Sequence, residues 1–177
     1  MSAINANSSF APVLIVAGPT ASGKSALALD MAEAFDGVVI NADSMQVYKE
    51  LRILSARPDE SETARAPHRL YGVLSGREAC SAGKWREMAM VEIADCHAWG
   101  KLPIITGGTG MYLNALTEGI APIPDVPARI RDSVTAELED LGHAAFFEKL
   151  AKDDPETAAT LDGTNTQRLI RAAEVFA

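Results

Sequence analysis

Cysteine, histidine and aromatic residues are all scarce in this chain of 177 residues. The two cysteines, Cys80 and Cys96, are far apart and make no C-x-x-C motif, and the three histidines are scattered. This pattern excludes a disulfide framework and a zinc site built from Cys and His. We therefore expect both thiols to be reduced and Cys96 to pack in the interior.

Long apolar runs and a basic leader are also missing. No stretch approaches the roughly 20 apolar residues of a membrane span, and residues 1–12 lack the features of a secretory signal. Acidic residues outnumber basic ones by 24 to 16, a formal net charge of -8. Such a balance argues against general affinity for nucleic acid. We expect a cytoplasmic protein without membrane contact, in which any nucleic-acid binding is local.

The strongest pattern is a glycine-containing turn between a short apolar run and an amphipathic one. Residues 13–17 predict a strand, and residues 27–35 place apolar side chains at helical spacing. The turn between them, GPTASGKS at residues 18–25, fits the G-x-x-x-x-G-K-[ST] pattern of a P-loop. The alternative is a turn that merely connects a strand to a helix.

A P-loop binds phosphate because its glycines let backbone N–H groups turn towards an anion at a helix N-terminus. Lys24 would bring a positive charge to the phosphates, and the Ser25 hydroxyl would complete the coordination of Mg²⁺. The predicted diphosphate- or nucleotide-binding residues are Gly18, Pro19, Thr20, Ala21, Ser22, Gly23, Lys24 and Ser25. The loop alone indicates a ligand class and no reaction.

A polar segment follows a second apolar run. Residues 38–40 predict a strand, and NADSMQVY follows at residues 41–48. Because parallel strands end at the same edge of a sheet, we expect Asp43 to lie near the phosphates. Its carboxylate could hold Mg²⁺ through water, act as a base, or cap the following turn.

The next part of the chain predicts short elements and then a long helix. Residues 51–80 have no sustained periodicity, which is typical of a lid, a substrate-binding segment or a plain surface connection. Ser81 is expected to cap a helix that runs to about Trp99. We place both Trp85 and Trp99 in the core.

A third strand and glycine turn complete the predicted sheet edge. Residues 104–106 are a short buried strand, and GGTGMYLNAL follows at residues 107–116. Thr109 in that turn is expected either to hydrogen-bond a substrate or to cap the next helix.

The chain changes character at IAPIPDVP, residues 120–127, which holds three prolines. We divide it into an extended or disordered N-terminus at 1–12, a P-loop α/β core at 13–119 and a helical segment at 120–177. In that segment we expect helices at 128–141 and 144–151 separated by Gly142, a short helix from Pro155, and a last helix from Asn165 or Thr166. Only three strands are visible and the last helix is still periodic at residue 177, so we expect the natural protein to continue.

Four blocks together resemble the tRNA dimethylallyltransferases, also called tRNA isopentenyltransferases. They are GPTASGKS, NADSMQVY, GGTGMYLNAL and the pattern N-x-Q-R-x-I-R-A-x-E-V that starts at Asn165, in the family's order and roughly its spacing. The resemblance implies a P-loop NTPase-like parallel sheet flanked by helices, followed by the incomplete start of a helical tRNA-binding insertion. It also implies a C-terminal portion beyond this chain, and it leaves open whether the chain is active without it.

The resemblance implies that the loop holds dimethylallyl diphosphate rather than ATP, with Mg²⁺. Members of the family transfer the dimethylallyl group to N6 of the adenine just 3′ of the anticodon, in tRNAs that read codons starting with U. The catalytic residues implied are Asp43, which would accept the proton of the amine, Thr20, which would contact the diphosphate, and Lys24. The implied contacts to the tRNA anticodon stem-loop are Asp43, Ser44, Met45, Gln46, Thr109, Arg131, Gln167, Arg168 and Arg171. We expect a monomer.

Three other interpretations stay open from the sequence. A P-loop kinase of a small metabolite would fill the loop with ATP, and Asp43 would deprotonate a hydroxyl. An adenylate-type isopentenyltransferase would prenylate free adenine nucleotides. A chain that only binds RNA or diphosphate would show saturable binding without turnover.

Overall fold

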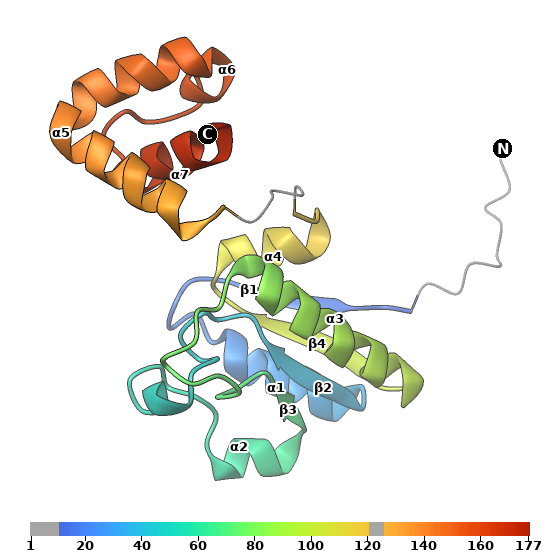
Figure 1. Cartoon of the computed structure of the whole chain (residues 1–177). Coiled ribbons are helices and arrows are strands. Elements are labelled where there is room, and N and C mark those ends of the chain that lie inside the picture. Colours follow the sequence, from blue (N-terminus) through green and yellow to red (C-terminus); the bar gives the residue numbers. More distant parts are fainter. Residues whose placement is uncertain (1–10, 121–125) are drawn as a thin grey trace, which may run out of the picture. The chain divides into compact units, whose positions relative to one another are not determined.

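The computed structural model describes residues 11–120 and 126–177 and divides into two compact units, Met1–Ile120 and Ala121–Ala177 (Figure 1). The expected extended or disordered N-terminus at residues 1–12 lies almost wholly outside the described residues. Most of the proline-containing boundary at residues 120–127 lies outside them too. Within the described ranges, no helix combines the length and apolar character needed to cross a membrane.

The first unit is built on a parallel sheet of four strands in the order β1-β4-β2-β3. The strands are β1 (Leu14–Ala17), β2 (Gly37–Asn41), β3 (His68–Arg69) and β4 (Leu102–Gly107). The last residues of β1 and β2 pair with the last residues of β4, as Ala17 with Gly107 and Asn41 with Thr106. The three loops that follow these strands therefore start at one edge of the sheet.

The sequence predicted three strands, and the fourth is a correction. Strand β3 has only two residues, which pair with Val39 and Ile40 of β2. Two residues are too few to show an alternating or apolar pattern. The sequence of residues 51–80 therefore did not predict β3.

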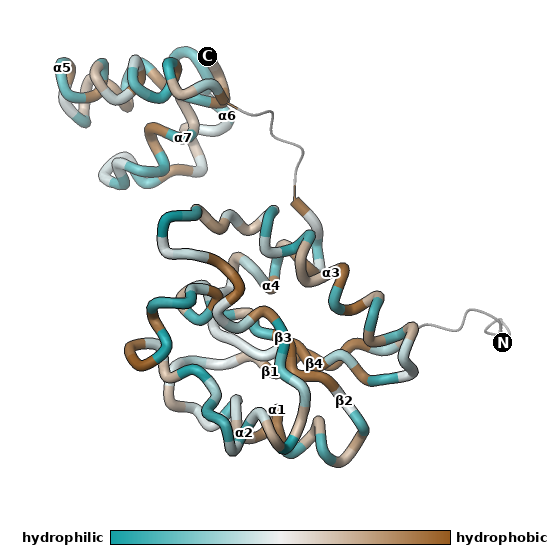
Figure 2. The backbone as a smooth tube through the Cα atoms, turned by 60° about the horizontal axis from the view of Figure 1, so that its bottom comes forward, coloured by the Kyte–Doolittle hydropathy of each residue, from teal (hydrophilic) through white to brown (hydrophobic). Residues whose placement is uncertain are grey.

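Helices cover both faces of the sheet because its residues alternate between two cores. Val39 and Ile104 pack with residues of α1 (Lys24–Ala34) on one face. Val38, Ile40 and Ile105 pack on the other face with residues of α3 (Ala82–Ala98) and α4 (Gly110–Thr117). Figure 2 shows the hydrophobic colour running along the central strands between these helices. The predicted α/β fold, a parallel sheet flanked by helices, is confirmed.

Helix α3 begins as predicted, with the Ser81 hydroxyl accepting a hydrogen bond from the backbone N–H of Lys84. Trp85 is fully buried and its ring stacks on Tyr112, with centroids 4.7 Å apart. Trp99 is 56% exposed, so its predicted place in the core is wrong. The reason is that α3 ends at Ala98, and Trp99 as the C-terminal cap residue leaves the buried face of the helix. Cys96 is buried, as predicted.

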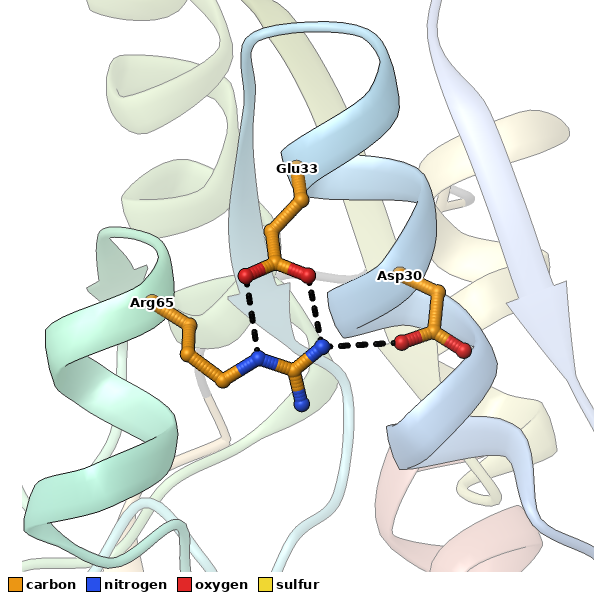
Figure 3. Close-up of polar contacts among 3 residues, drawn as sticks. All are labelled: Asp30, Glu33 and Arg65. Atoms are coloured by element: carbon orange, nitrogen blue, oxygen red, sulfur yellow. Dashed lines mark hydrogen bonds and ion pairs between the residues drawn. The ribbon is translucent and has the colours of Figure 1, made fainter.

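The segment from residue 51 to residue 80 contains α2 (Glu60–Arg65), which is tied to α1 by one arginine. The Arg65 guanidinium donates to both carboxylate oxygens of Glu33, at 3.0 and 2.6 Å, and to Asp30 Oδ1 at 3.0 Å (Figure 3). The hydrogen bond from Arg65 lowers the pKa of Glu33. These side chains are solvent-exposed, so the contact orients α2 more than it stabilises the fold.

The second unit is helical. Its elements are α5 (Ala128–Asp153), α6 (Pro155–Ala158) and α7 (Thr166–Phe176). Gly142, with φ 74° and ψ 164°, interrupts α5 where the sequence predicted a break. Helices α6 and α7 start where the sequence predicted, and the side chains of Asp154 and Asn165 cap them. Apolar residues from both halves of α5 share a core with Leu169 of α7.

A substitution at Gly107, the last residue of β4, tests the close contact between the end of β4 and the loop after β2. A Cβ built there would overlap backbone atoms of Ala42, so Gly107→Ala must displace one of the two chain segments. We expect it to lower the free energy of unfolding by about 3 kcal/mol, measured by urea denaturation. Gly110→Ala is the matched control, because its Cβ would meet nothing within 4 Å. Equal unfolding midpoints for the two variants would contradict this close approach.

Candidate functional site

The loop with the P-loop pattern, residues 18–25, leads directly into α1. Gly23 precedes the helix with a φ of 81°, a left-handed conformation that glycine adopts without strain. Ala21 also has a positive φ, 63°, which is uncommon for a residue with a side chain and concentrates at ligand sites. Lys24 is the first residue of α1, and its Nζ donates to the carbonyl of Pro19 at 3.0 Å. The lysine charge thus lies over the loop that is predicted to hold phosphate.

Asp43 is held in place by the buried side chain of Asn41. Asn41 Nδ2 donates to the carbonyls of Leu70 and Asp43, at 3.1 and 3.0 Å, and its Oδ1 accepts from the backbone N–H of Asp43 at 2.9 Å. Asp43 Oδ1 in turn accepts from the N–H of Met45 at 2.8 Å. The turn-capping role that the sequence allowed for Asp43 is therefore present. It uses Oδ1 and leaves Oδ2 for other contacts.

The loop after β2 is fastened to the turn after β4. The N–H of Ala42 donates to the carbonyl of Thr106 at 2.7 Å, and the carbonyl of Ala42 accepts from the N–H of Thr109 at 3.3 Å. The Thr109 hydroxyl accepts from the N–H of Ser44 at 2.9 Å. Thr109 stands at the N-cap position of α4, but its side chain makes no capping hydrogen bond. The capping alternative is therefore wrong, and the hydroxyl positions the Asp43 loop instead.

These segments converge on one cavity of about 140 Å³. Its lining comes from the P-loop, from the loop after β2, from residues 55–56 and from the end of β4: Thr20, Ala21, Lys24, Ser25, Asp43, Gln46, Ser55, Ala56, Thr106 and Gly107. The cavity therefore carries a cation and a carboxylate on adjacent segments. Gln46 Nε2 donates to the carbonyl of Ser55 at 2.8 Å. This hydrogen bond anchors residues 55–56 at the cavity.

The oxygen donors on this cavity suit a metal that is shared with a phosphate ligand. Ser25 and Thr106 contribute hydroxyls and Asp43 a carboxylate. Thr106 Oγ1 is buried and has no hydrogen-bond partner in the described part of the chain. In residues 11–120 and 126–177, no group of three or more His, Cys, Asp or Glu converges on one point. Mg²⁺ is commonly held by one or two protein oxygens together with substrate phosphates, and this donor set fits that mode.

The remaining predicted tRNA contacts lie in the helical unit. Arg131 belongs to α5, and Gln167, Arg168 and Arg171 belong to α7, all with exposed side chains. Arg131 Nε is 3.3 Å from Oε1 of Glu174, and Arg171 Nη1 donates to Oε2 of the same residue at 3.0 Å. The carboxylate of Glu174 thus links Arg131 and Arg171, two of the predicted tRNA contacts.

Sequence reasoning missed several residues of these sites. Asn41 could have been found, because a polar residue at the end of an apolar strand must find a buried partner. Thr106 carried the same signal in β4. Ser55 and Ala56 gave no signal, since a non-local path of the chain brings them to the cavity. The burial of Glu174 was not predicted, because a charged residue in a helix is usually exposed.

Comparisons with known proteins agree on one family. A family model described as IPP transferase matches residues 46–177, well over half of the chain. The tRNA dimethylallyltransferase of Paramagnetospirillum magneticum is 55% identical over 164 residues, which cover 93% of this chain and 52% of that protein. The corresponding protein of Rhodospirillum rubrum is 54% identical over 165 residues, covering 93% and 51%. The chain spans about half the length of the curated relatives it matches.

Solved structures give the same result. A tRNA isopentenylpyrophosphate transferase from Bacillus halodurans has a TM-score of 0.62 and 33% identity, over 94% of this chain and 55% of that one. A eukaryotic dimethylallyltransferase, described as acting on tRNA, has a TM-score of 0.78 and 30% identity, over 93% and 41%. The resemblance drawn from the four sequence blocks is confirmed, and the chain belongs to the IPP transferase family.

Proposed function

We propose that this chain contributes the donor site and part of the RNA-binding surface of a tRNA dimethylallyltransferase. The observation that carries the proposal is the cavity on which Lys24 of the P-loop and Asp43 of the following loop both lie. A cation suits an anionic leaving group and a carboxylate suits an amine that must lose a proton. The curated relatives named above carry this activity in their names.

The reaction forms one carbon–nitrogen bond and breaks one carbon–oxygen bond. N6 of the adenine just 3′ of the anticodon attacks the allylic carbon of dimethylallyl diphosphate, and diphosphate leaves with the electron pair of the broken bond. Positive charge develops on the allyl group and negative charge on the leaving oxygens. The backbone N–H groups of the P-loop and the ammonium of Lys24 would stabilise the leaving diphosphate, and Thr20, which lines the same cavity, would contact it.

Asp43 is proposed to accept the proton that N6 loses. An exocyclic amine conjugated to an aromatic ring is a weak nucleophile, so its orientation matters as much as the base. The hydrogen bonds of Asn41 and Thr109 fix the backbone on both sides of Asp43. Mg²⁺, held by Ser25 and by the diphosphate itself, would neutralise charge on the leaving group.

The RNA side of the proposal uses both units. The residues Ser44, Met45, Gln46 and Thr109 would contact the anticodon loop around the target adenine. Gln167, Arg168, Arg131 and Arg171 would contact the stem-loop. Loop bases of RNA are unstacked more easily than paired ones, and a target base outside the stack can enter an enclosed pocket. In tRNAs that read codons starting with U, that base is the proposed acceptor.

The test is a transfer assay with tRNA, Mg²⁺ and dimethylallyl diphosphate, followed by nucleoside digestion and mass analysis. The full-length relative from Paramagnetospirillum magneticum serves as the positive control. ATP and AMP replace donor and acceptor in parallel arms. Dimethylallyl adenosine in the tRNA arm supports the proposal; consumption of ATP, or prenylation of AMP in preference to tRNA, contradicts it.

Lys24→Ala removes the cation from the cavity. We expect the rate of transfer to fall by about a hundredfold or more, because one preorganised charge partner of the leaving group is lost. The matched control is Lys84→Ala, which removes the same charge from an exposed ion pair with Glu78 outside the cavity. A Lys24 variant as fast as the Lys84 variant would reject the P-loop as the donor site.

Asp43→Asn replaces the proposed base while an amide oxygen can still accept from the N–H of Met45. We therefore expect an intact loop, unchanged affinity for tRNA and a rate of transfer lower by about a hundredfold or more. Asp43→Ala, which also loses the turn, should be worse in both respects. If Asp43→Asn loses tRNA affinity and keeps its rate at saturation, Asp43 acts as a contact and not as the base.

A further inference from the structure

Glu174 is a charged residue inside the helical unit. Its side chain in α7 is only 3% exposed, and it is the only charged residue among the buried ones that the structure describes. Burying a carboxylate costs free energy unless cations and hydrogen bonds compensate it. The contacts of Glu174 therefore need a physical explanation beyond packing.

Two arginines from two helices compensate this charge. Arg171, one turn earlier in α7, donates through Nη1 to Oε2 at 3.0 Å. Arg131 of α5 places Nε at 3.3 Å from Oε1. Oε1 accepts no hydrogen bond within residues 11–120 and 126–177, so the ion pair with Arg131 is what balances it. One carboxylate thus connects the two helices through two guanidinium groups.

Both guanidinium groups remain open to solvent on their other sides. The Arg131 side chain is 71% exposed and that of Arg171 is 50% exposed. A guanidinium has five N–H donors in a planar fork, and the carboxylate takes only one side of each. Two like charges held next to one another repel, and the buried anion between them offsets this repulsion. The triad keeps a net charge of about +1.

The helical unit around these two arginines is acidic overall. Residues 126–177 contain ten Asp and Glu against six Lys and Arg. Net charge therefore opposes the approach of RNA to this unit, and any affinity must come from ordered local contacts. Guanidinium forks suit phosphate oxygens, which accept paired N–H donors.

We propose that Glu174 is a positioning residue for RNA binding, which holds Arg131 and Arg171 together as one site for a single backbone phosphate. This rests on the proposed function, since it takes both arginines as RNA contacts. It differs from two independent contacts, because loss of the buried carboxylate must weaken both arginines at once.

The test is Glu174→Gln in the 177-residue chain, with binding to an anticodon stem-loop RNA followed by fluorescence anisotropy. We expect binding about tenfold weaker, although the substitution removes a negative charge. Asp140→Asn is the matched control, because Asp140 is exposed in the same unit and the charge change is the same. It should leave binding unchanged or slightly tighter. Glu174→Gln with unchanged or tighter binding would show that the residue only links the helices.

The salt dependence gives a readout that a purely structural role does not move. If both arginines act on one phosphate, Glu174→Gln should lower the slope of log affinity against log salt by about one. Circular dichroism and urea unfolding check that the variant is folded. An unchanged slope in a folded variant overturns the proposal.

A double-mutant cycle keeps the proposal falsifiable if Glu174→Gln does not fold. Arg131→Ala and Arg171→Ala are combined while Glu174 stays in place, and RNA binding is measured for each. One shared site predicts that the double variant loses much less than the sum of the single losses. Additive losses mean two independent contacts and reject the shared site.

A titration of the chain with inorganic phosphate distinguishes failure of the anion site from failure of the proposed tRNA function. Binding is followed by NMR of the arginine side-chain N–H signals. If the chain fails to bind the RNA but phosphate shifts the signals of Arg131 and Arg171 together, the tRNA assignment fails and the anion site stands. If phosphate moves neither signal, the anion site is rejected. If RNA binds and only one arginine responds, the shared site is rejected while the function stands.

Discussion

The backbone contact between Ala42 and the end of β4 is the constraint on which the proposed donor site depends. At this point the loop after β2 and the turn after β4 share backbone hydrogen bonds, and the absence of a side chain on Gly107 permits the approach. Asp43 follows immediately, and the side chains of Asn41 and Thr109 hydrogen-bond to the backbone of its loop. These contacts hold the carboxylate at the cavity that it shares with Lys24, without an ordered ligand.

The helical unit uses a different solution to a related problem. There the organising element is a buried carboxylate, which gives two exposed cations a fixed arrangement in a region of acidic composition. The first unit positions Asp43 with hydrogen bonds of backbone and neutral side chains, and the second positions its arginines with charge. An interaction of charged groups depends more on ionic strength than one of neutral groups. The two units should therefore respond differently to solution conditions.

The sequence predicted the parts of the fold that have long or motif-rich signals. The succession of β1 and α1 around residues 18–25, helix α3 with its Ser81 cap and the break at Gly142 all follow from local pattern and capping chemistry. The prediction failed where a signal was short or where position mattered more than residue type. Strand β3 has too few residues for periodicity, and Trp99 follows the spacing of α3 but lies past its end. Glu174 could not be recognised as buried, because burial of a charge depends on partners from a distant helix. The site roles of Asp43, Thr20 and the arginines stay predictions.

The contact at Gly107 also limits how this chain can vary by mutation. An added Cβ would meet backbone atoms of Ala42, and no change of side chain at position 42 moves those atoms away. Second-site suppressors at the contacting residue are thus unavailable, unlike in a packed core, where a smaller neighbour can compensate for a larger one. At Gly107, genetic reversion should therefore be restricted to restoring the glycine.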